Sequence, residues 1–157
     1  MHIQKAHVSF RDPLLPLQDV TKIIIHHTAE DGWDVYKAHE FHRNSRGWSG
    51  IGYNYFIEEN STVYEGRGLH IGAHAKGYNT NSIGICVAGN FDVYDPTPVQ
   101  MISLHWLCKQ FMHQFSLNSE HVLGHRELNG VTKTCPGTRF SMETLRHILS
   151  NNEKGAL

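Results

Sequence analysis

Apolar residues along the chain change between two spacings, and this pattern predicts strands separated by helices. The run that begins at Val20 ends in Ile23-Ile24-Ile25, and a second continuous run spans Ser82 to Ala88. Short apolar runs rich in β-branched residues are typical of strands buried on both faces of a sheet. A shorter run around Val122 precedes a glycine-rich segment. We therefore expect buried strands over about residues 20–25, 82–88 and 121–123.

Three segments have the spacing of amphipathic helices. The first begins after Asp34, a good N-cap, and extends to about Asn44 before Gly47 ends it. The second extends from Thr97 to about Phe115, and its Thr-Pro-Val-Gln start combines a capping box with proline at the first helical position. The third follows Ser141 and ends near Leu149. The expected inward-facing residues are Val35, Ala38 and Phe41, then Met101, Leu104, Cys108, Phe111 and Phe115, then Leu145, Ile148 and Leu149.

The remaining segments complete the expected fold. Residues 51–57 and 62–65 flank a polar turn and predict a hairpin. Residues 66–81 form a long glycine-rich loop, residues 1–19 are irregular, and residues 151–157 should fray. Strands that alternate with helices predict an α/β fold, a single domain with a central mixed β-sheet flanked by helices. The domain would span residues 1–157, with its core at about 20–150.

Charge and hydropathy exclude several classes of function. The chain has 157 residues and a formal net charge of −1, which argues against nucleic-acid binding. It contains no apolar run of membrane-spanning length, and its first residues lack the apolar segment of a signal peptide. We expect a monomer that is made in the cytoplasm without a signal peptide and does not insert into membranes.

The three cysteines do not suggest a disulfide framework, because their number is odd. Cys86 falls in a strand pattern and Cys108 in a helix pattern, so both are expected to be small core residues. A reducing compartment would keep them as thiols.

The segment Gly124 to Gly137 contains His125 and Cys135, and imidazole and thiolate are the commonest zinc ligands. A chance pairing is the alternative, because the chain contains 13 histidines. His26 follows a buried strand, at a sheet edge where α/β folds place their chemistry. It would complete three protein ligands and leave the fourth zinc position open for water, as in catalytic sites. His27 competes with His26, but neighbours on a strand face opposite ways.

Four blocks in order resemble a known family. They are Ile-Ile-Ile-His-His-Thr-Ala, Gly-Trp-Ser-Gly-Ile-Gly-Tyr-Asn-Tyr-Phe-Ile, Gly-Ala-His-Ala-Lys-Gly-Tyr-Asn-Thr-Asn-Ser-Ile-Gly-Ile, and Gly-His-Arg-Glu followed by Lys-Thr-Cys-Pro-Gly. The chain resembles the zinc N-acetylmuramoyl-L-alanine amidases related to phage amidase-type lysozymes and animal peptidoglycan recognition proteins. The resemblance covers about residues 20–150 and implies the same fold and one Zn²⁺ per chain, held by His26, His125 and Cys135.

The resemblance also implies two catalytic residues. Tyr53 matches the family's catalytic tyrosine, and its phenol would hold the attacking water. Lys133 matches the catalytic lysine of the phage type, and its ammonium would stabilise an oxyanion. The structural alternatives are a core aromatic and a solvated lysine. At the position of Cys135 the cytosolic wall-recycling amidases carry Asp with the same ten-residue spacing, so this chain mixes two patterns.

The glycine-rich loop is implied to line a groove for the stem peptide of peptidoglycan. His74, Tyr78 and Asn79 are the candidate groove residues there. Trp48 would form groove wall or core, and His42 would be mainly structural. Arg67 would meet a peptide carboxylate, with a solvated arginine as the alternative.

The expected function is a zinc hydrolase that cuts the amide bond between N-acetylmuramic acid and L-alanine, in a phage or prophage endolysin released to the cell wall by a holin-like route. A cytoplasmic wall-recycling amidase acting on anhydro-muropeptides is the alternative enzyme. A non-catalytic peptidoglycan-binding module is a second alternative, although such relatives typically lose the ligand cysteine. A structural zinc protein would need His27 or His121 as a fourth ligand.

Overall fold

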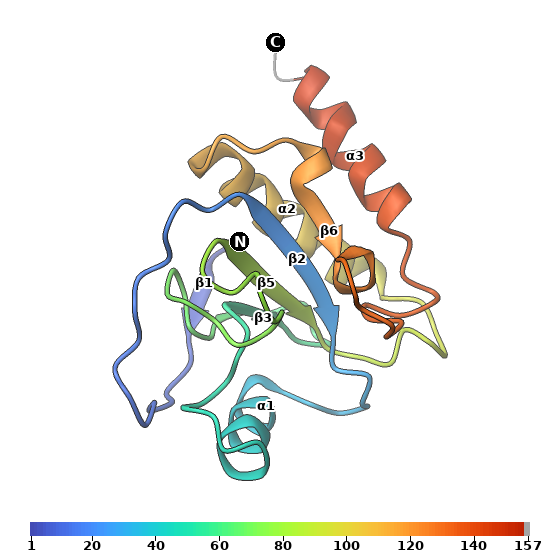
Figure 1. Ribbon diagram of the computed structural model, residues 1–157. Helices are drawn as coiled ribbons and strands as arrows, with labels where there is room; N and C mark the ends of the chain where they lie inside the picture. Colours follow the sequence, from blue (N-terminus) through green and yellow to red (C-terminus); the bar gives the residue numbers. More distant parts are fainter. Residues whose placement is uncertain (156–157) are drawn as a thin grey trace.

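A computed structural model describes the backbone of residues 1–155 and the side chains of residues 1–151. A mixed six-stranded sheet forms the centre of the molecule in the order β1-β4-β3-β5-β2-β6 (Figure 1). Every neighbouring pair is parallel except β3 and β4, which form the predicted hairpin. The strands are β1 (Ile3–Lys5), β2 (Lys22–His27), β3 (Tyr55–Ile57), β4 (Val63–Glu65), β5 (Ser82–Val87) and β6 (Val122–Gly124). The predicted α/β class is confirmed.

The helices begin where the sequence predicts. In α1 (Val35–Glu40) the Asp34 carboxylate accepts from the Lys37 amide, and in α2 (Pro98–Gln114) Thr97 and Gln100 form the capping box. Ser141 accepts from the Thr144 amide at the start of α3 (Met142–Gly155). Three short elements complete the fold: the π-helical turn η1 (Phe41–Ser45) and the 3₁₀ turns η2 (Ser119–His121) and η3 (His125–Glu127).

The two faces of the sheet are covered differently. Alternate residues of β2 and β5, such as Ile23, Ile25 and Ile85, face α2 and α3 and form the main core with Leu104 and Leu145. The opposite face packs against α1 and carries Phe56 and Cys86. Figure 1 shows α1 well apart from α2 and α3. Polar side chains on the α1 face are therefore separated from the main core by the sheet itself.

Several boundaries differ from the predictions. Residues 1–19 are not wholly irregular, because β1 pairs with β4 in parallel and Pro16 bridges to His70. The third strand begins at Tyr55 rather than residue 51, because the chain before it bonds to the glycine-rich loop, for example from the Ala73 amide to the Gly52 carbonyl. The helix α3 continues to Gly155, beyond the predicted end at Leu149, and residues 156–157 lie outside the described residues. Within residues 1–155 no helix is both long and apolar enough to cross a membrane.

All three cysteines are free thiols in the structure, with Cys86 and Cys108 buried and Cys135 partly buried. We expect thiol titration of unfolded, metal-free protein to count three reactive groups. Cys86 and Cys108 are buried in different parts of the core, so they are not paired with each other and are shielded from oxidants in the folded protein. Native protein should react more slowly than unfolded protein, which serves as the comparison. A count of one thiol in the unfolded chain would show that a disulfide exists and would contradict this arrangement.

Candidate metal centre and adjoining cleft

Three predicted ligands converge at the end of the sheet. His26 lies near the end of β2, on the face opposite the main core, and Ile25 pairs with Gly124 of β6. This register places His125, the first residue after β6 and the start of η3, beside His26, with the two ring centroids 4.6 Å apart. The following loop turns back so that the Arg126 amide donates to the Cys135 carbonyl at 2.8 Å. One ligand atom from each of His26, His125 and Cys135 lies within 4.8 Å of the other two.

His27 faces the other way, as the alternation of strand residues requires. Its Nδ1 accepts a hydrogen bond from the Phe91 amide at 3.1 Å, and its ring stacks on the Phe91 ring. His121 is also occupied elsewhere, because its Nδ1 accepts from the Asn118 amide. Neither histidine joins the cluster, and within residues 1–151 the cluster offers three protein ligands rather than four.

The donor set fits a tetrahedral zinc ion. In such a site the bonds of ~2.0–2.3 Å place neighbouring ligand atoms roughly 3.3–3.8 Å apart. The His26 Nδ1 and Cys135 Sγ atoms are 3.7 Å apart. Two imidazoles and a thiolate leave one corner of the tetrahedron open, which is the pattern of catalytic rather than structural zinc sites.

The electrostatics of the cluster favour neutral imidazoles. Burial lowers the pKa of His26 well below its ordinary value, and the neighbouring His74 and His125 lower it further. Burial and the charge of Lys133 lower the pKa of His125. Burial raises the pKa of the Cys135 thiol to about 11, although a hydrogen bond from the His27 backbone opposes this shift. Both imidazoles therefore offer lone pairs at neutral pH, whereas the thiol needs a bound cation to lose its proton.

Two side chains, Asp92 and Arg126, hold the loop that carries Lys133 and Cys135 by hydrogen bonds. On one side the Asp92 carboxylate accepts from the Thr138 amide at 2.8 Å and from the Thr134 hydroxyl at 3.0 Å. On the other side the Arg126 guanidinium donates to the carbonyls of Thr134, Gly137 and Phe140. These bonds satisfy loop carbonyls that have no strand partner, and they fix the position of Cys135.

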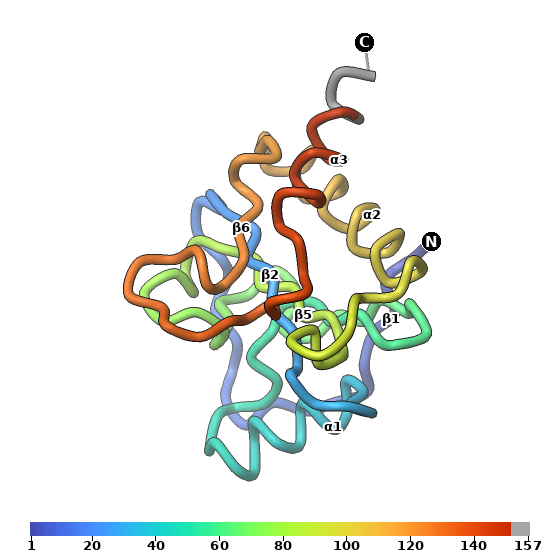
Figure 2. Tube along the Cα trace, turned by 90° about the vertical axis from the view of Figure 1, so that its right-hand side faces the viewer, coloured from blue at the N-terminus to red at the C-terminus, as the bar shows by residue number. Residues whose placement is uncertain are grey.

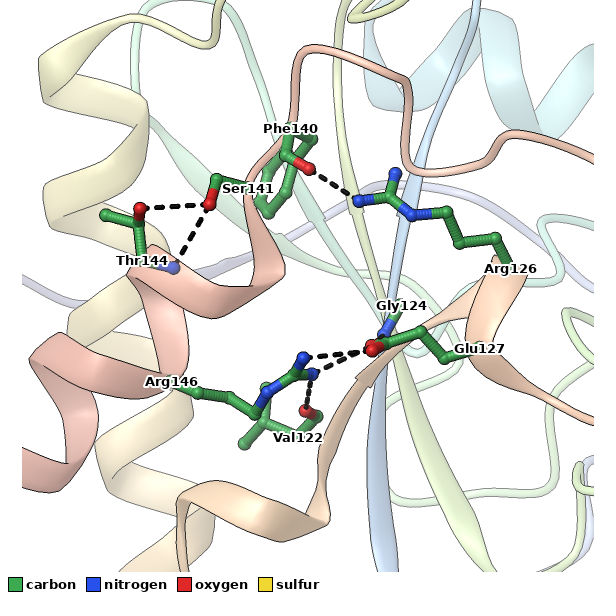
Figure 3. A network of polar contacts seen from close by, with 8 residues as sticks. All are labelled: Val122, Gly124, Arg126, Glu127, Phe140, Ser141, Thr144 and Arg146. Carbon is green, nitrogen blue, oxygen red and sulfur yellow. Dashed lines mark hydrogen bonds and ion pairs between the residues drawn. The ribbon is translucent and has the colours of Figure 1, made fainter.

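A second network ties β6 and η3 to the final helix (Figure 3). Glu127 of η3 accepts from the Gly124 amide and forms a two-bond ion pair with Arg146 of α3, at 2.8 and 2.9 Å. Arg146 also donates to the Val122 carbonyl at 3.0 Å. The side chains of Arg146 and Glu127 are 24% and 31% exposed, so the pair is partly shielded from water. Strand β6 and the turn η3 that begins at His125 are thereby held to α3.

We expect Arg146→Ala to destabilise the protein by about 1–2 kcal/mol, because it removes a two-bond ion pair and a bond to a strand carbonyl. Urea unfolding at pH 7 measures this loss. Burial alone would raise the pKa of Glu127, but hydrogen bonds from Arg146 and the Gly124 amide lower it overall. The stabilisation should therefore be complete above the unfolded pKa of this carboxyl, and it should disappear as the pH falls through the lower folded pKa.

The matched control is Arg139→Ala, which breaks the exposed ion pair with Asp95, whose side chains are 52% and 68% exposed. Exposed pairs contribute less than about 1 kcal/mol. An equal loss in both variants at pH 7 would contradict the special role of the Arg146 network.

A cleft of about 450 Å³ opens over the cluster, and both predicted catalytic residues line it. Tyr53 is partly buried two residues before β3, with its ring centroid 5.3 Å from that of His26. Burial raises the pKa of Tyr53 well above its ordinary value, and the nearby Cys86 and Cys135 raise it further, so the phenol stays protonated. Lys133 is an exposed loop residue that also lines the cleft.

A second hollow continues from this cleft, and both the loop after β4 and the loop after η3 line it. Figure 2 shows these two loops on the same side of the molecule. Three of the candidate groove residues, His74, Trp48 and Asn79, line the second hollow. The Asn79 side chain also shapes its own loop, because Oδ1 accepts from the amides of His74 and Ala75. Lys76 and Lys133 line the hollow as well, so its border carries positive charge.

Two predicted groove residues are not brought to either hollow. Tyr78 packs against the cluster of Ile24, Ala75 and Leu128, with the Lys22 ammonium over its ring. Arg67 is neither solvated nor placed for a peptide carboxylate, which corrects both interpretations. Its guanidinium donates to the carbonyls of Ile51 and Ile71 at 2.7 and 3.2 Å, because the loop after β4 folds back over residues 50–52. His42 is structural as expected, since its Nδ1 accepts from the Gly52 amide.

Sequence reasoning missed two residues that line the cleft. Arg46 borders both hollows and lies over the ring of Trp48, and Asp92 fixes the Cys135 loop from a segment distant in sequence. An isolated exposed arginine or aspartate in a loop gives no sequence pattern that separates it from ordinary surface charge.

The sequence pattern of the N-acetylmuramoyl-L-alanine amidase family matches residues 16–138. The chain is 37% identical over 127 residues to peptidoglycan-recognition protein SC2 of Drosophila simulans, covering 74% of this chain and 68% of that protein. It is 35% identical over 127 residues to the endolysin of Escherichia phage T7, covering 77% of this chain and 81% of the endolysin.

Solved structures with the same fold include both amidases and peptidoglycan recognition proteins. The endolysin N-acetylmuramoyl-L-alanine amidase LysCS from Clostridium intestinale URNW superposes with a TM-score of 0.87 at 32% identity, covering 94% of this chain and 95% of that one. Peptidoglycan recognition protein LE, solved in complex with tracheal cytotoxin, gives a TM-score of 0.80 at 29% identity, covering 90% of this chain and 91% of that one.

Proposed function

Because the chain belongs to the N-acetylmuramoyl-L-alanine amidase family, we propose that it is a zinc hydrolase that cuts the amide bond between N-acetylmuramic acid and L-alanine of peptidoglycan. The observation that carries this proposal is the convergence of His26, His125 and Cys135 beneath a cleft lined by Tyr53 and Lys133. A module that only binds peptidoglycan would not need a thiol, a phenol and an ammonium around one open ligand position.

When bound, zinc would polarise the amide carbonyl and lower the pKa of a coordinated water. His26, His125 and Cys135 would hold the ion through Nδ1 of His26, one ring nitrogen of His125 and the Cys135 thiolate. The buried, neutral state of the two imidazoles favours such binding, because no proton has to leave either ring.

Tyr53 and Lys133 would act on the two sides of the reacting amide. The Tyr53 phenol keeps its proton, so it can hold the attacking water by hydrogen bonding rather than act as a base. Lys133 lines the cleft and is exposed, so its ammonium would be free to approach the carbonyl oxygen as negative charge develops there. The loop clamps formed by Asp92 and Arg126 hold this lysine in register with the Cys135 ligand.

The second hollow would accept the stem peptide. Peptide amides need donors and acceptors, and stem peptides carry free carboxylates that favour a positive border such as Lys76 and Arg46. The relative solved with tracheal cytotoxin, a monomeric diaminopimelic acid-type peptidoglycan, supports a peptidoglycan ligand for this fold. We propose a monomeric endolysin, in line with the phage and clostridial relatives.

Two substrates separate the proposed role from wall recycling. Purified full-length protein is incubated with intact sacculi and, separately, with soluble anhydro-muropeptides, each with and without a zinc chelator. An endolysin should clear sacculi and lose that activity with the chelator. Activity confined to anhydro-muropeptides would favour the recycling enzyme, and binding of sacculi without hydrolysis would favour the non-catalytic module.

A further inference from the structure

A line of hydrogen bonds leads from His26 through His74, which also lines the cleft, to Ser82. His26 Nε2 lies 2.9 Å from His74 Nδ1, and His74 Nε2 lies 3.3 Å from Ser82 Oγ. The Ser82 hydroxyl in turn donates to the Tyr78 carbonyl at 2.6 Å. His26 belongs to β2, Ser82 begins the neighbouring strand β5, and His74 bridges them from the glycine-rich loop.

The ends of this line fix the direction of every proton in it. His26 Nδ1 faces Cys135 Sγ at 3.7 Å and must present a lone pair to bind a metal, so Nε2 carries the ring proton. That N–H donates to His74 Nδ1, which leaves the proton of His74 on Nε2. His74 Nε2–H then donates to Ser82 Oγ, whose own proton goes to the Tyr78 carbonyl, a group that can only accept.

The protein makes room for the His74 ring and holds it. A side chain at Gly84 of β5 would place its Cβ 2.4 Å from Cγ of His74, so this strand position must lack one. The Asn79 side chain fixes the backbone on which His74 lies by accepting from the amides of His74 and Ala75, each at 2.9 Å. Only 9% of His74 is exposed. A ring that only contacted the substrate would not need hydrogen-bond partners within the protein for both of its nitrogens, as His74 has in His26 and Ser82.

We propose that His74 and Ser82 are positioning residues for the metal centre, which hold His26 in the tautomer and ring orientation that direct Nδ1 at the ion. This assigns the His74 imidazole to the ligand His26 rather than to the stem peptide. The inference rests on the zinc site of the proposed function. Outer hydrogen-bond partners of metal-binding histidines commonly contribute about 10- to 100-fold to metal affinity.

The test is the zinc affinity of the purified full-length protein, measured by competition with a chelator of known affinity. His74→Phe keeps an aromatic ring but cannot accept the His26 proton, and it should weaken zinc binding about 10- to 100-fold. His74→Asn places an amide oxygen near the position of Nδ1 and should restore much of the loss. Ser82→Ala removes the far end of the line without touching the cleft and should weaken binding in the same direction.

The matched control is Ser103→Ala. Ser103 is a buried serine whose hydroxyl donates to the Ser61 carbonyl at 2.7 Å, remote from the metal centre. It should bind zinc as tightly as the parent protein. In addition, ¹⁵N NMR of the zinc-loaded parent should show protons on Nε2 of both His26 and His74, and Ser82→Ala should shift the His74 signals.

The outcomes separate this inference from the zinc site itself. If the parent protein binds no zinc, the proposed function fails first. If the parent binds zinc and His74→Phe, His74→Asn and Ser82→Ala all match it, the positioning role is overturned. The same holds if His74→Phe fails to fold but Ser82→Ala binds zinc normally, or if NMR places the His74 proton on Nδ1.

Discussion

Cys135→Ala is expected to lose most bound zinc and all measurable amidase activity. The thiolate is one of the three protein ligands that the cluster provides, and its negative charge would offset part of the positive charge of the zinc ion. Its loss should therefore weaken binding by more than the roughly 10- to 100-fold typical of an outer hydrogen-bond partner. Metal analysis after dialysis should find about one zinc per chain in the parent protein and little in the variant.

The control for Cys135→Ala is Cys108→Ala. Cys108 belongs to α2 and is buried in the main core, outside the cluster of ligand atoms, so its replacement removes a thiol without removing a ligand. That variant should retain zinc and activity even if its stability falls. Full zinc retention in Cys135→Ala would remove this residue from the ligand set and leave the site with only two imidazoles.

Lys133→Ala and Tyr53→Phe are expected to lose activity while keeping zinc. Neither side chain is among the three ligand groups, and both line the cleft above them. Each is proposed to act on the transition state, and loss of such a group costs on the order of 100- to 1,000-fold in rate, or ~3–4 kcal/mol. The loss should appear mainly in kcat, because both groups are proposed to act on the transition state; any change in KM should be smaller and confined to Lys133→Ala, since Lys133 also borders the second hollow.

Lys109→Ala is the control for the charge change in Lys133→Ala, since Lys109 is an exposed lysine of α2 outside both hollows. It should leave kcat and KM unchanged. A Lys133→Ala enzyme with near-normal kcat would leave the developing oxyanion without a protein partner. Loss of zinc from Tyr53→Phe would instead show that the phenol supports the metal site.

The elements that carry strong local patterns could be predicted from the sequence. The run Ile23-Ile24-Ile25 and the capping box at Thr97 specify their elements locally, and β2 and α2 form where expected. The strand β1 was missed because its three residues, Ile3 to Lys5, have no clear alternation and gain their order from β4, which lies about 60 residues away in sequence.

The site residues show the same difference between those that belong to a local sequence pattern and those that do not. The order of motifs along the chain was enough to nominate His26, His125 and Cys135, and the structure brings them together. The supporting groups could not be nominated. Asp92 acts through bonds to Thr134 and Thr138, which lie far from it in sequence, and Ser82 acts through bonds to the loop before its own strand. An exposed aspartate or a strand serine has many other uses, so neither carries a sequence signal for this role. Arg67 was misplaced because nothing local indicates that its guanidinium binds backbone carbonyls.

Identification of the bond that is cut tests the central claim most directly. Sacculi digested by the purified protein are analysed for new chain ends, with a zinc-free sample and a zinc-restored sample alongside. We predict new amino-terminal L-alanine and intact glycan strands without new reducing ends, in the parent and zinc-restored samples but not in the zinc-free one. New reducing sugar ends, cleavage inside the stem peptide, or undiminished cleavage without zinc would contradict the account.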